Sequence, residues 1–116
     1  MTRPADSITI DDLDSQERAK WSEKKFQAKV RREAEQQGWR IYAVWDSRKT
    51  PSGWPDLTLV RGKRLCFWEL KSQKGKKPRP EQMEWLADLA EAGAETAWYR
   101  PSDWETIIRN LEEATV

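Results

Sequence analysis

The feature that most constrains this sequence is a pair of short apolar segments, residues 55–60 and 64–71, joined by the turn Arg61-Gly62-Lys63. Two short apolar segments with a glycine-containing turn between them are typical of two antiparallel strands in a β-hairpin. The sequence therefore predicts a hairpin near the middle of the chain.

Three charged side chains lie at one end of this predicted hairpin. Asp56 is near the start of the first strand, and Glu69 and Lys71 are near the end of the second. Because successive side chains of a strand point to opposite faces, Glu69 and Lys71 share a face, and strand pairing brings Asp56 within reach of both. Two carboxylates and an ammonium group on rigid strands are suited to hold a hard divalent cation and to hydrolyse a phosphodiester.

Helices and two further strands are predicted around the hairpin. Apolar spacing and turn residues predict a loose acidic arm over residues 1–14, a helix over 15–37, a strand over 41–45, a helix over 80–92, a strand over 94–99 and a last helix opened by Pro101-Ser102-Asp103. Trp85, Trp98 and Trp104 fall on the predicted core faces. The order α-β-β-β-α-β-α over residues 15–116 predicts one α/β domain with a mixed four-stranded sheet flanked by helices.

The scarce residue types exclude several kinds of chemistry. The 116 residues contain no histidine, which removes histidine general bases, Ser-His-Asp triads and the common zinc sites. The single cysteine, Cys66, excludes an internal disulfide and, with an N-terminus that lacks a secretion signal, predicts a cytoplasmic protein. No apolar run is long enough to span a membrane. The remaining reactive groups are carboxylates, lysine, water and any bound metal ion.

Charge is distributed unevenly, although 21 basic and 20 acidic residues leave a net charge of only +1. Residues 17–80, which include the hairpin, contain 18 basic and 7 acidic side chains, whereas residues 81–116 contain 2 basic and 9 acidic ones. A positive middle segment favours a polyanion such as nucleic acid. Solvated helix surface is the alternative, and it better suits the four residues Lys24, Lys25, Arg31 and Arg32.

Two polar residues fall on predicted core faces near the charged cluster. In the first helix, Glu23 shares a face with Phe26 and Val30, where an unpaired carboxylate is costly. Glu23 either reaches the rim of the core, or shares the metal site or pairs with Lys71. Gln82 lies on the apolar stripe of the next helix.

The pattern resembles the PD-(D/E)XK nuclease superfamily and, within it, the stand-alone VRR-NUC domains of phages and bacteria. The matching residues, within about residues 20–112, are Glu23, Phe26-Gln27, Ser47, Gly53-Trp54-Pro55-Asp56-Leu57, Glu69-Leu70-Lys71, Gly75, Gln82 and Trp98-Tyr99-Arg100-Pro101-Ser102-Asp103. Relatives often carry a histidine in the first strand, where this chain has Ala43. The resemblance implies a restriction-endonuclease-like core and DNA cleavage with Mg²⁺ or Mn²⁺. Several such proteins resolve or nick branched DNA, including Holliday junctions, as dimers.

The resemblance also assigns catalytic roles. The metal ligands would be Asp56, Glu69 and the backbone carbonyl of Leu70. Glu23 would join them through a metal-bound water or hold Lys71. Lys71 would orient an attacking water made more acidic by the metal, or stabilise charge on the phosphate. Gln82 would hydrogen-bond that water or the lysine; the alternative is a hydrogen-bonded core amide.

Residues on both sides of the charged cluster are predicted to bind nucleic acid. They are Ser47, Arg48 and Lys49 before Asp56, and Lys74, Lys76, Lys77 and Arg79 after Lys71. Such contacts to phosphates are independent of base sequence and sensitive to salt. Trp54 and Trp45 either stack on unpaired bases or pack beneath the loop.

The main hypothesis is a divalent-metal-dependent DNA endonuclease that acts on branched or structured DNA, as a junction resolvase or nickase does. Two alternatives use the same residues: a module that binds DNA junctions without cutting them, and a metal-dependent nuclease for single-stranded DNA or RNA. A chain of this size offers little surface for two duplex arms, so a homodimer is expected.

Overall fold

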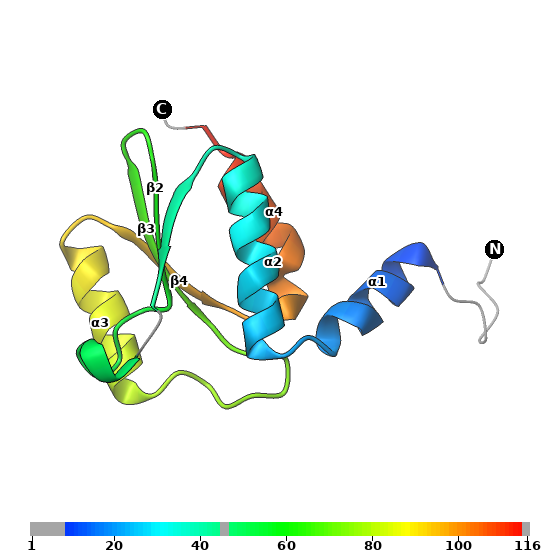
Figure 1. Ribbon diagram of the computed structural model, residues 1–116, viewed down its shortest axis with the longest axis horizontal. Helices are drawn as coiled ribbons and strands as arrows, with labels where there is room; N and C mark the ends of the chain where they lie inside the picture. Colours follow the sequence, from blue (N-terminus) through cyan, green and yellow to red (C-terminus); the bar gives the residue numbers. More distant parts are fainter. Residues whose placement is uncertain (1–8, 45–46, 115–116) are drawn as a thin grey trace.

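The computed structural model describes residues 9–44 and 47–114. Its elements are α1 (Ile10–Ala19), α2 (Glu23–Gln36), β1 (Arg40–Ala43), the 3₁₀ turn η1 (Ser47–Lys49), β2 (Leu57–Arg61), β3 (Arg64–Leu70), α3 (Pro80–Glu91), β4 (Glu95–Tyr99), the 3₁₀ turn η2 (Pro101–Asp103) and α4 (Trp104–Glu112). The predicted α/β fold with its central hairpin is confirmed (Figure 1). None of the helices in these two ranges is long and apolar enough to cross a membrane.

The four strands form one mixed sheet in the order β1-β2-β3-β4. β1 pairs with β2 and β2 with β3 in antiparallel fashion, whereas β4 lies parallel to β3 after α3 has returned the chain to the other end. Gly62 turns the hairpin with a φ of +60°, a conformation that L side chains rarely adopt. Because β3 and β4 are parallel, Leu70 and Tyr99 end these two strands side by side.

Helices cover both faces of the sheet (Figure 1). α2 and α4 lie over one face and α3 lies over part of the other. Alternate side chains of β2, Leu57 and Leu59, are fully buried, whereas Val60 is exposed on the α3 side. The core between the sheet and α2 and α4 also includes Phe26, Val30, Ala34, Cys66, Leu70, Ile107 and Leu111.

The prediction of one continuous helix over residues 15–37 is wrong, because α1 and α2 are separated by Lys20-Trp21-Ser22. Trp21 is buried at the break, where its ring packs edge-on against Trp104 with ring centres 5.3 Å apart and also contacts Phe26. The free energy gained by burying this large apolar side chain exceeds the small differences in helix propensity along the segment. Tertiary packing therefore divides the helix.

The expected arm over residues 1–14 is also helical in part. α1 begins at Ile10 and is capped by Thr9, whose side chain accepts a hydrogen bond of 3.0 Å from the backbone N–H of Asp12. α1 contains no buried residue and extends away from the sheet (Figure 1). Residues 1–8 lie outside the described part of the chain.

Two further sequence predictions need correction. β1 begins at Arg40 and ends at Ala43, and the expected strand residue Trp45 lies outside the described residues. The buried tryptophans are Trp21, Trp39 and Trp68, whereas Trp85, Trp98 and Trp104 are half-buried. Trp104 does pack against the core, but Trp85 and Trp98 lie on the α3 side, where a single helix covers less of the sheet.

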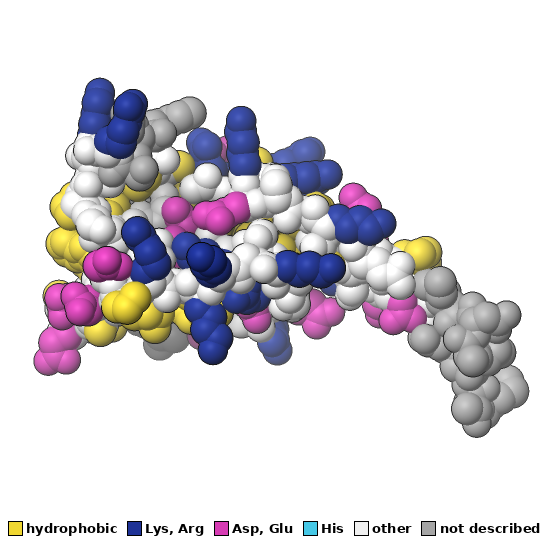
Figure 2. Space-filling model, turned by 90° about the horizontal axis from the view of Figure 1, so that it is seen from below, with side chains coloured by type: hydrophobic (Ala, Val, Ile, Leu, Met, Phe, Trp, Pro, Cys, Tyr) yellow, Lys and Arg dark blue, Asp and Glu magenta, His cyan; other side chains and the backbone are white. Residues whose placement is uncertain are grey.

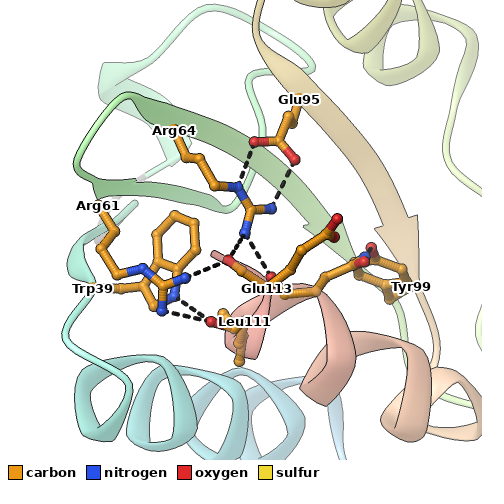
Figure 3. A network of polar contacts seen from close by, with 8 residues as sticks. Trp39, Arg61, Arg64, Glu95, Tyr99, Leu111 and Glu113 are labelled. Carbon is orange, nitrogen blue, oxygen red and sulfur yellow. Dashed lines mark hydrogen bonds and ion pairs between the residues drawn. The ribbon is translucent and has the colours of Figure 1, made fainter. Parts of the chain in front are cut away.

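Two arginines attach the end of α4 to the hairpin (Figure 3). The guanidinium groups of Arg61 and Arg64 lie 4.6 and 4.9 Å from the ring centre of Trp39. Arg61 donates a hydrogen bond of 2.7 Å to the carbonyl of Leu111, and Arg64 donates one of 2.9 Å to that of Glu113. These bonds pair carbonyl groups that the end of a helix leaves without intrahelical partners.

Candidate active site

The hairpin brings Asp56 and Glu69 together at one end of the sheet. β2 and β3 pair with Leu57 opposite Trp68, so Asp56 and Glu69 occupy the next pair of positions along the two chains. Oδ2 of Asp56 accepts a hydrogen bond of 2.8 Å from the backbone N–H of Leu70. This bond holds one carboxylate against the strand that carries the other.

Lys71 lies on the same side of the chain as Glu69, as strand alternation predicts. Its Nζ is 3.7 Å from Oε1 of Glu69. The backbone N–H of Lys71 donates a hydrogen bond of 3.0 Å to the carbonyl of Tyr99, at the end of β4. The sheet therefore sets the position of the lysine at the point where the chain leaves β3.

Glu69 is the most constrained side chain of this cluster. The residue is only 1% exposed, and its Oε1 accepts a hydrogen bond of 2.9 Å from Nε2 of Gln82. Its Oε2 is buried and has no hydrogen-bond partner among the described residues. Burial and the neighbouring carboxylate of Asp56 raise the pKa of Glu69 to about 9, against the opposing effect of Lys71. The cluster thus contains more carboxyl groups than the single positive charge of Lys71 can neutralise.

Glu23 is the first residue of α2, directly after the capping residue Ser22. Partial burial of its carboxyl group raises the pKa of Glu23, the nearby Asp56 raises it further, and Lys71 lowers it. The carboxyl group therefore lies within electrostatic range of the cluster, although the residue as a whole is exposed. Glu23 thus lies at the exposed rim of the core, which was one of the sequence-based alternatives. It is also close to the charged cluster, which was the other.

Gln82 connects α3 to the charged cluster. Its Oε1 accepts a hydrogen bond of 2.7 Å from the backbone N–H of Arg79 at the start of α3, while its Nε2 donates to Glu69. Both ends of the buried amide are therefore used. Gln82 is a hydrogen-bonded core amide and, at the same time, a direct partner of the central carboxylate.

The loop before Asp56 approaches the first turn of α3 very closely. Gly53 has a φ of +86°, and a Cβ at this position would lie only 2.6 Å from the backbone carbonyl carbon of Glu81. Glycine is the residue that tolerates both constraints. Beside this contact is a cleft of about 280 Å³ lined by Val44, Thr50, Pro51, Ser52, Gly53, Trp54, Asp56, Arg79 and Gln82.

Trp54 is half-buried at this cleft. Its ring packs edge-on against Phe67 and Trp85, with ring centres 5.7 and 4.9 Å away. Nε1 of Trp85 in turn donates a hydrogen bond of 3.0 Å to the carbonyl of Ser52. The packing role considered for Trp54 is therefore observed, and stacking on a base stays a prediction.

Exposed basic side chains surround the site. All six are exposed: Arg48 and Lys49 in η1, and Lys74, Lys76, Lys77 and Arg79 between β3 and α3. The segment between β3 and α3 lies at the bottom of Figure 1, and the view from below in Figure 2 shows Lys and Arg side chains spread over this face. Ser47 begins η1, but its side chain, like Trp45, lies outside the described part of the chain.

The acidic residues do not form a closed metal cage. In residues 9–44 and 47–114, no three Asp, Glu or Cys side chains converge closely enough to hold a metal ion by themselves. The donors nevertheless fit Mg²⁺, which takes oxygen ligands and keeps several waters, so that few protein ligands suffice. The buried, unpartnered Oε2 of Glu69 and the raised pKa values of Glu23 and Glu69 show that the ionised form of these carboxyl groups lacks a compensating positive charge, which a bound cation would supply.

Two residues of the matching motifs have contacts that the sequence did not indicate. Gly53 precedes Trp54-Pro55-Asp56, and its positive φ is the reason for a glycine there. Arg100 hydrogen-bonds the segment that follows Lys71. An arginine directly after a predicted strand was the only signal for this contact, and the sequence alone did not say what it bonds.

Comparisons with known proteins support the resemblance at the level of the fold. A scan of protein-family models and a search of curated proteins find no match. Among solved structures, a protein described as "VRR_NUC domain" matches with a TM-score of 0.64 and 21% identity, over 81% of this chain and 98% of that one. A "VRR_NUC domain protein" matches with a TM-score of 0.63 and 20% identity, over 79% of this chain and 86% of that one. The chain therefore has the fold of the VRR_NUC domains.

Proposed function

We propose that this protein is a divalent-metal-dependent endonuclease that hydrolyses phosphodiester bonds in DNA, with branched or structured DNA as its substrate. The observation that carries the proposal is the buried carboxylate of Glu69, which has one unpartnered oxygen and lies beside Asp56 and Lys71. The fold shared with VRR_NUC domains supports the same class of reaction.

Asp56, Glu69 and the backbone carbonyl of Leu70 would hold Mg²⁺ or Mn²⁺, with Glu23 at the edge of the same site. When bound, the ion supplies Lewis acidity and lowers the pKa of water, so that a nucleophile is available at neutral pH. Gln82 fixes the orientation of Glu69 through its 2.9 Å hydrogen bond. The carboxylates are therefore held in place before a substrate arrives.

Lys71 provides the positive charge for the reacting phosphate. It is held 3.7 Å from Glu69, so its ammonium group can neutralise charge that develops on the phosphate oxygens or orient the attacking water. The chain contains no histidine that could act as a general base instead. In this proposal, Lys71 acts on the phosphate or the attacking water, and the carboxylates bind the metal ion.

The basic residues around the site would hold the DNA backbone. Lys74, Lys76, Lys77 and Arg79 follow Lys71 closely, and Ser47, Arg48 and Lys49 begin the loop that leads to Asp56. Contacts of this type go to phosphates and carry no base preference. Specificity for branched DNA would come from the shape of the substrate, with Trp54 available for an unpaired base and a second copy of the chain for the opposite strand.

Cleavage of matched end-labelled substrates tests this proposal. Linear duplex, flap, four-way junction, single-stranded DNA and RNA are incubated with Mg²⁺, Mn²⁺ or EDTA, using the wild type and the Asp56→Ala variant. The proposal expects metal-dependent products from branched DNA with the wild type only. Binding without products in Mn²⁺ would indicate a non-cleaving module, preferred cleavage of single strands or RNA would change the substrate, and normal cutting by Asp56→Ala would reject the site. The mass of the protein in solution tests the expected homodimer.

A further inference from the structure

The segment that follows Lys71 is folded around one side chain from a distant part of the chain. Three backbone carbonyls converge on Nη1 of Arg100, at 2.6 Å for Ser72, 3.2 Å for Gln73 and 2.8 Å for Gly75. The backbone N–H of Gly75 also donates a hydrogen bond of 3.2 Å to the carbonyl of Ser72 and closes a turn. A guanidinium group therefore sits at the centre of this turn.

Arg100 is itself fixed at the end of the sheet. It follows Tyr99, whose carbonyl accepts the hydrogen bond from the N–H of Lys71. Its guanidinium carbon lies 5.2 Å from the ring centre of Trp98, and its backbone N–H donates a hydrogen bond of 2.8 Å to Oδ2 of Asp103. The arginine is thus preorganised by β4 and η2 rather than by the segment that it binds.

A second contact joins the same two regions. Oε1 of Gln73 accepts a hydrogen bond of 2.9 Å from the backbone N–H of Ser102 in η2. Residues 72–75 are therefore held through their backbone carbonyls, by Arg100, and through the side chain of Gln73, by Ser102. The lysines that follow, Lys76 and Lys77, remain exposed on this framework, and Lys74 lies within the turn.

We propose that Arg100 is a positioning residue of the nuclease, which folds residues 72–75 so that Lys71 stays beside Glu69 while Lys74, Lys76 and Lys77 face the phosphates that flank the scissile bond. The inference rests on the proposed function. The three carbonyls share the two hydrogens of one nitrogen, Nη1. Arginine suits this task because its planar group lies over the ring of Trp98 and so holds that nitrogen in place, whereas a lysine ammonium is a flexible point charge. A small misplacement of a catalytic group is enough to lower the rate substantially.

The test compares Arg100→Gln and Arg100→Lys with the wild type and with Arg109→Gln as a matched control. Arg109 is an exposed arginine of α4 whose side chain hydrogen-bonds Thr106 on the same helix, so its removal changes the net charge equally. Three quantities are measured: kcat and KM for DNA cleavage, normalised to the concentration of active sites; the slope of log Kd against log salt for DNA binding; and hydrogen exchange at the amides of Gly75 and Ser102.

For Arg100→Gln we expect faster exchange at both amides, a kcat lower by ~10- to ~100-fold and a salt slope shallower by about 1 to 2. Arg100→Lys should recover part of kcat and of the slope, because it keeps the charge, and Arg109→Gln should match the wild type. A purely structural role would lower the melting temperature and the fraction of active enzyme without these changes per active site.

Unchanged exchange in a folded Arg100→Gln variant, or unchanged kcat and salt slope, would overturn the inference. If Arg100→Gln does not fold, as judged by circular dichroism, the same measurements are made on Arg100→Lys and compared with the wild type. A wild type that cuts none of the substrates would reject the proposed function instead, and the exchange and salt-slope measurements would still decide whether Arg100 organises a phosphate-binding segment.

Discussion

Nε2 of Gln82 donates a hydrogen bond of 2.9 Å to Oε1 of Glu69, which joins α3 to the central carboxylate of the site. The other end of the same amide accepts a bond of 2.7 Å from the N–H of Arg79 and so fixes the start of α3. One side chain therefore couples the beginning of a helix to the orientation of a predicted metal ligand. A change at Gln82 should affect both stability and catalysis, and different variants should separate them.

Gln82→Glu should lower the rate of catalysis while it keeps the cap of α3. A glutamate can still accept the hydrogen bond from Arg79, but it loses the donor to Glu69 and adds another carboxylate, so we expect a decrease of ~10- to ~100-fold in kcat. Gln82→Ala should in addition lose the cap, at a cost of about 1 kcal/mol in the free energy of unfolding. Steady-state kinetics and urea unfolding measure the two effects. A wild-type rate in Gln82→Glu would contradict the assigned role.

The stability of the metal-free protein should decrease as the pH rises. Burial and Asp56 raise the pKa of Glu69 from 4.5 to about 9 in the folded state, so below pH 4.5 both states are protonated, and above it the unfolded state loses its proton first. The folded state therefore becomes less stable from about pH 4.5 up to the folded pKa, by at most about 1.4 kcal/mol for each pH unit in this window. The raised pKa of Glu23 acts in the same direction.

Glu69→Gln should remove most of this pH dependence, because it keeps the shape and the acceptor for Gln82 without a charge to bury. Urea unfolding in EDTA at pH 5, 7 and 8.5 measures the effect, and the variant should be the more stable protein at pH 8.5. Equal slopes with pH for the variant and the wild type would show that Glu69 does not titrate as its surroundings indicate.

Divalent cations should stabilise the folded protein through the acidic cluster. At a concentration 100 times the dissociation constant, Mg²⁺ or Mn²⁺ would add about 2.7 kcal/mol to the free energy of unfolding at neutral pH. Asp56→Asn should lose most of this stabilisation, whereas Asp88→Asn, at an exposed residue of α3, should keep it. Thermal melts with and without metal make the comparison. Equal stabilisation of the wild type and both variants would show that the cation binds elsewhere.

Arg64 should contribute to stability without contributing to catalysis. Its guanidinium group forms a two-pronged pair with Glu95, at 2.7 and 2.8 Å, and donates to the carbonyls of Asn110 and Glu113 (Figure 3). Arg64→Met should lower the free energy of unfolding by about 2 to 3 kcal/mol, because the charged hydrogen bonds of the guanidinium group are removed. Lys63→Met, an exposed neighbour, should change it by less than about 0.5 kcal/mol. A large fall in kcat per active site for Arg64→Met would contradict this separation.

The lysines between β3 and α3 should set the salt dependence of DNA binding. Replacing Lys74, Lys76 and Lys77 together by alanine should make the slope of log K against log salt shallower by about 0.9 for each phosphate that the protein no longer neutralises, equally for different sequences. A control triple variant at Arg40, Lys63 and Arg109 removes the same charge from other elements. If both triple variants change the slope equally, the effect comes from net charge rather than from this segment.

The sequence allowed the hairpin, its charged residues and α3 to be predicted because these features are local. The two-residue period places Glu69 and Lys71 on one side, Gly62 marks the turn, and Pro80 marks the start of a helix. The boundaries near the N-terminus could not be predicted in the same way. Trp21 interrupts the helical segment only because Phe26 and Trp104 pack around its ring and bury it.

What the sequence determined by itself was the fold class and the convergence of Asp56, Glu69 and Lys71, because strand pairing and side-chain alternation follow from patterns only a few residues long. What only the tertiary structure decided were the partners of these groups, including the bond from Gln82 to Glu69 and the contact of Arg100 with residues 72–75. Such contacts join positions that are well separated along the chain. Their geometry is fixed by how α3 packs on the sheet and by where β4 pairs with β3, and neither can be read from the spacing of residues along the chain.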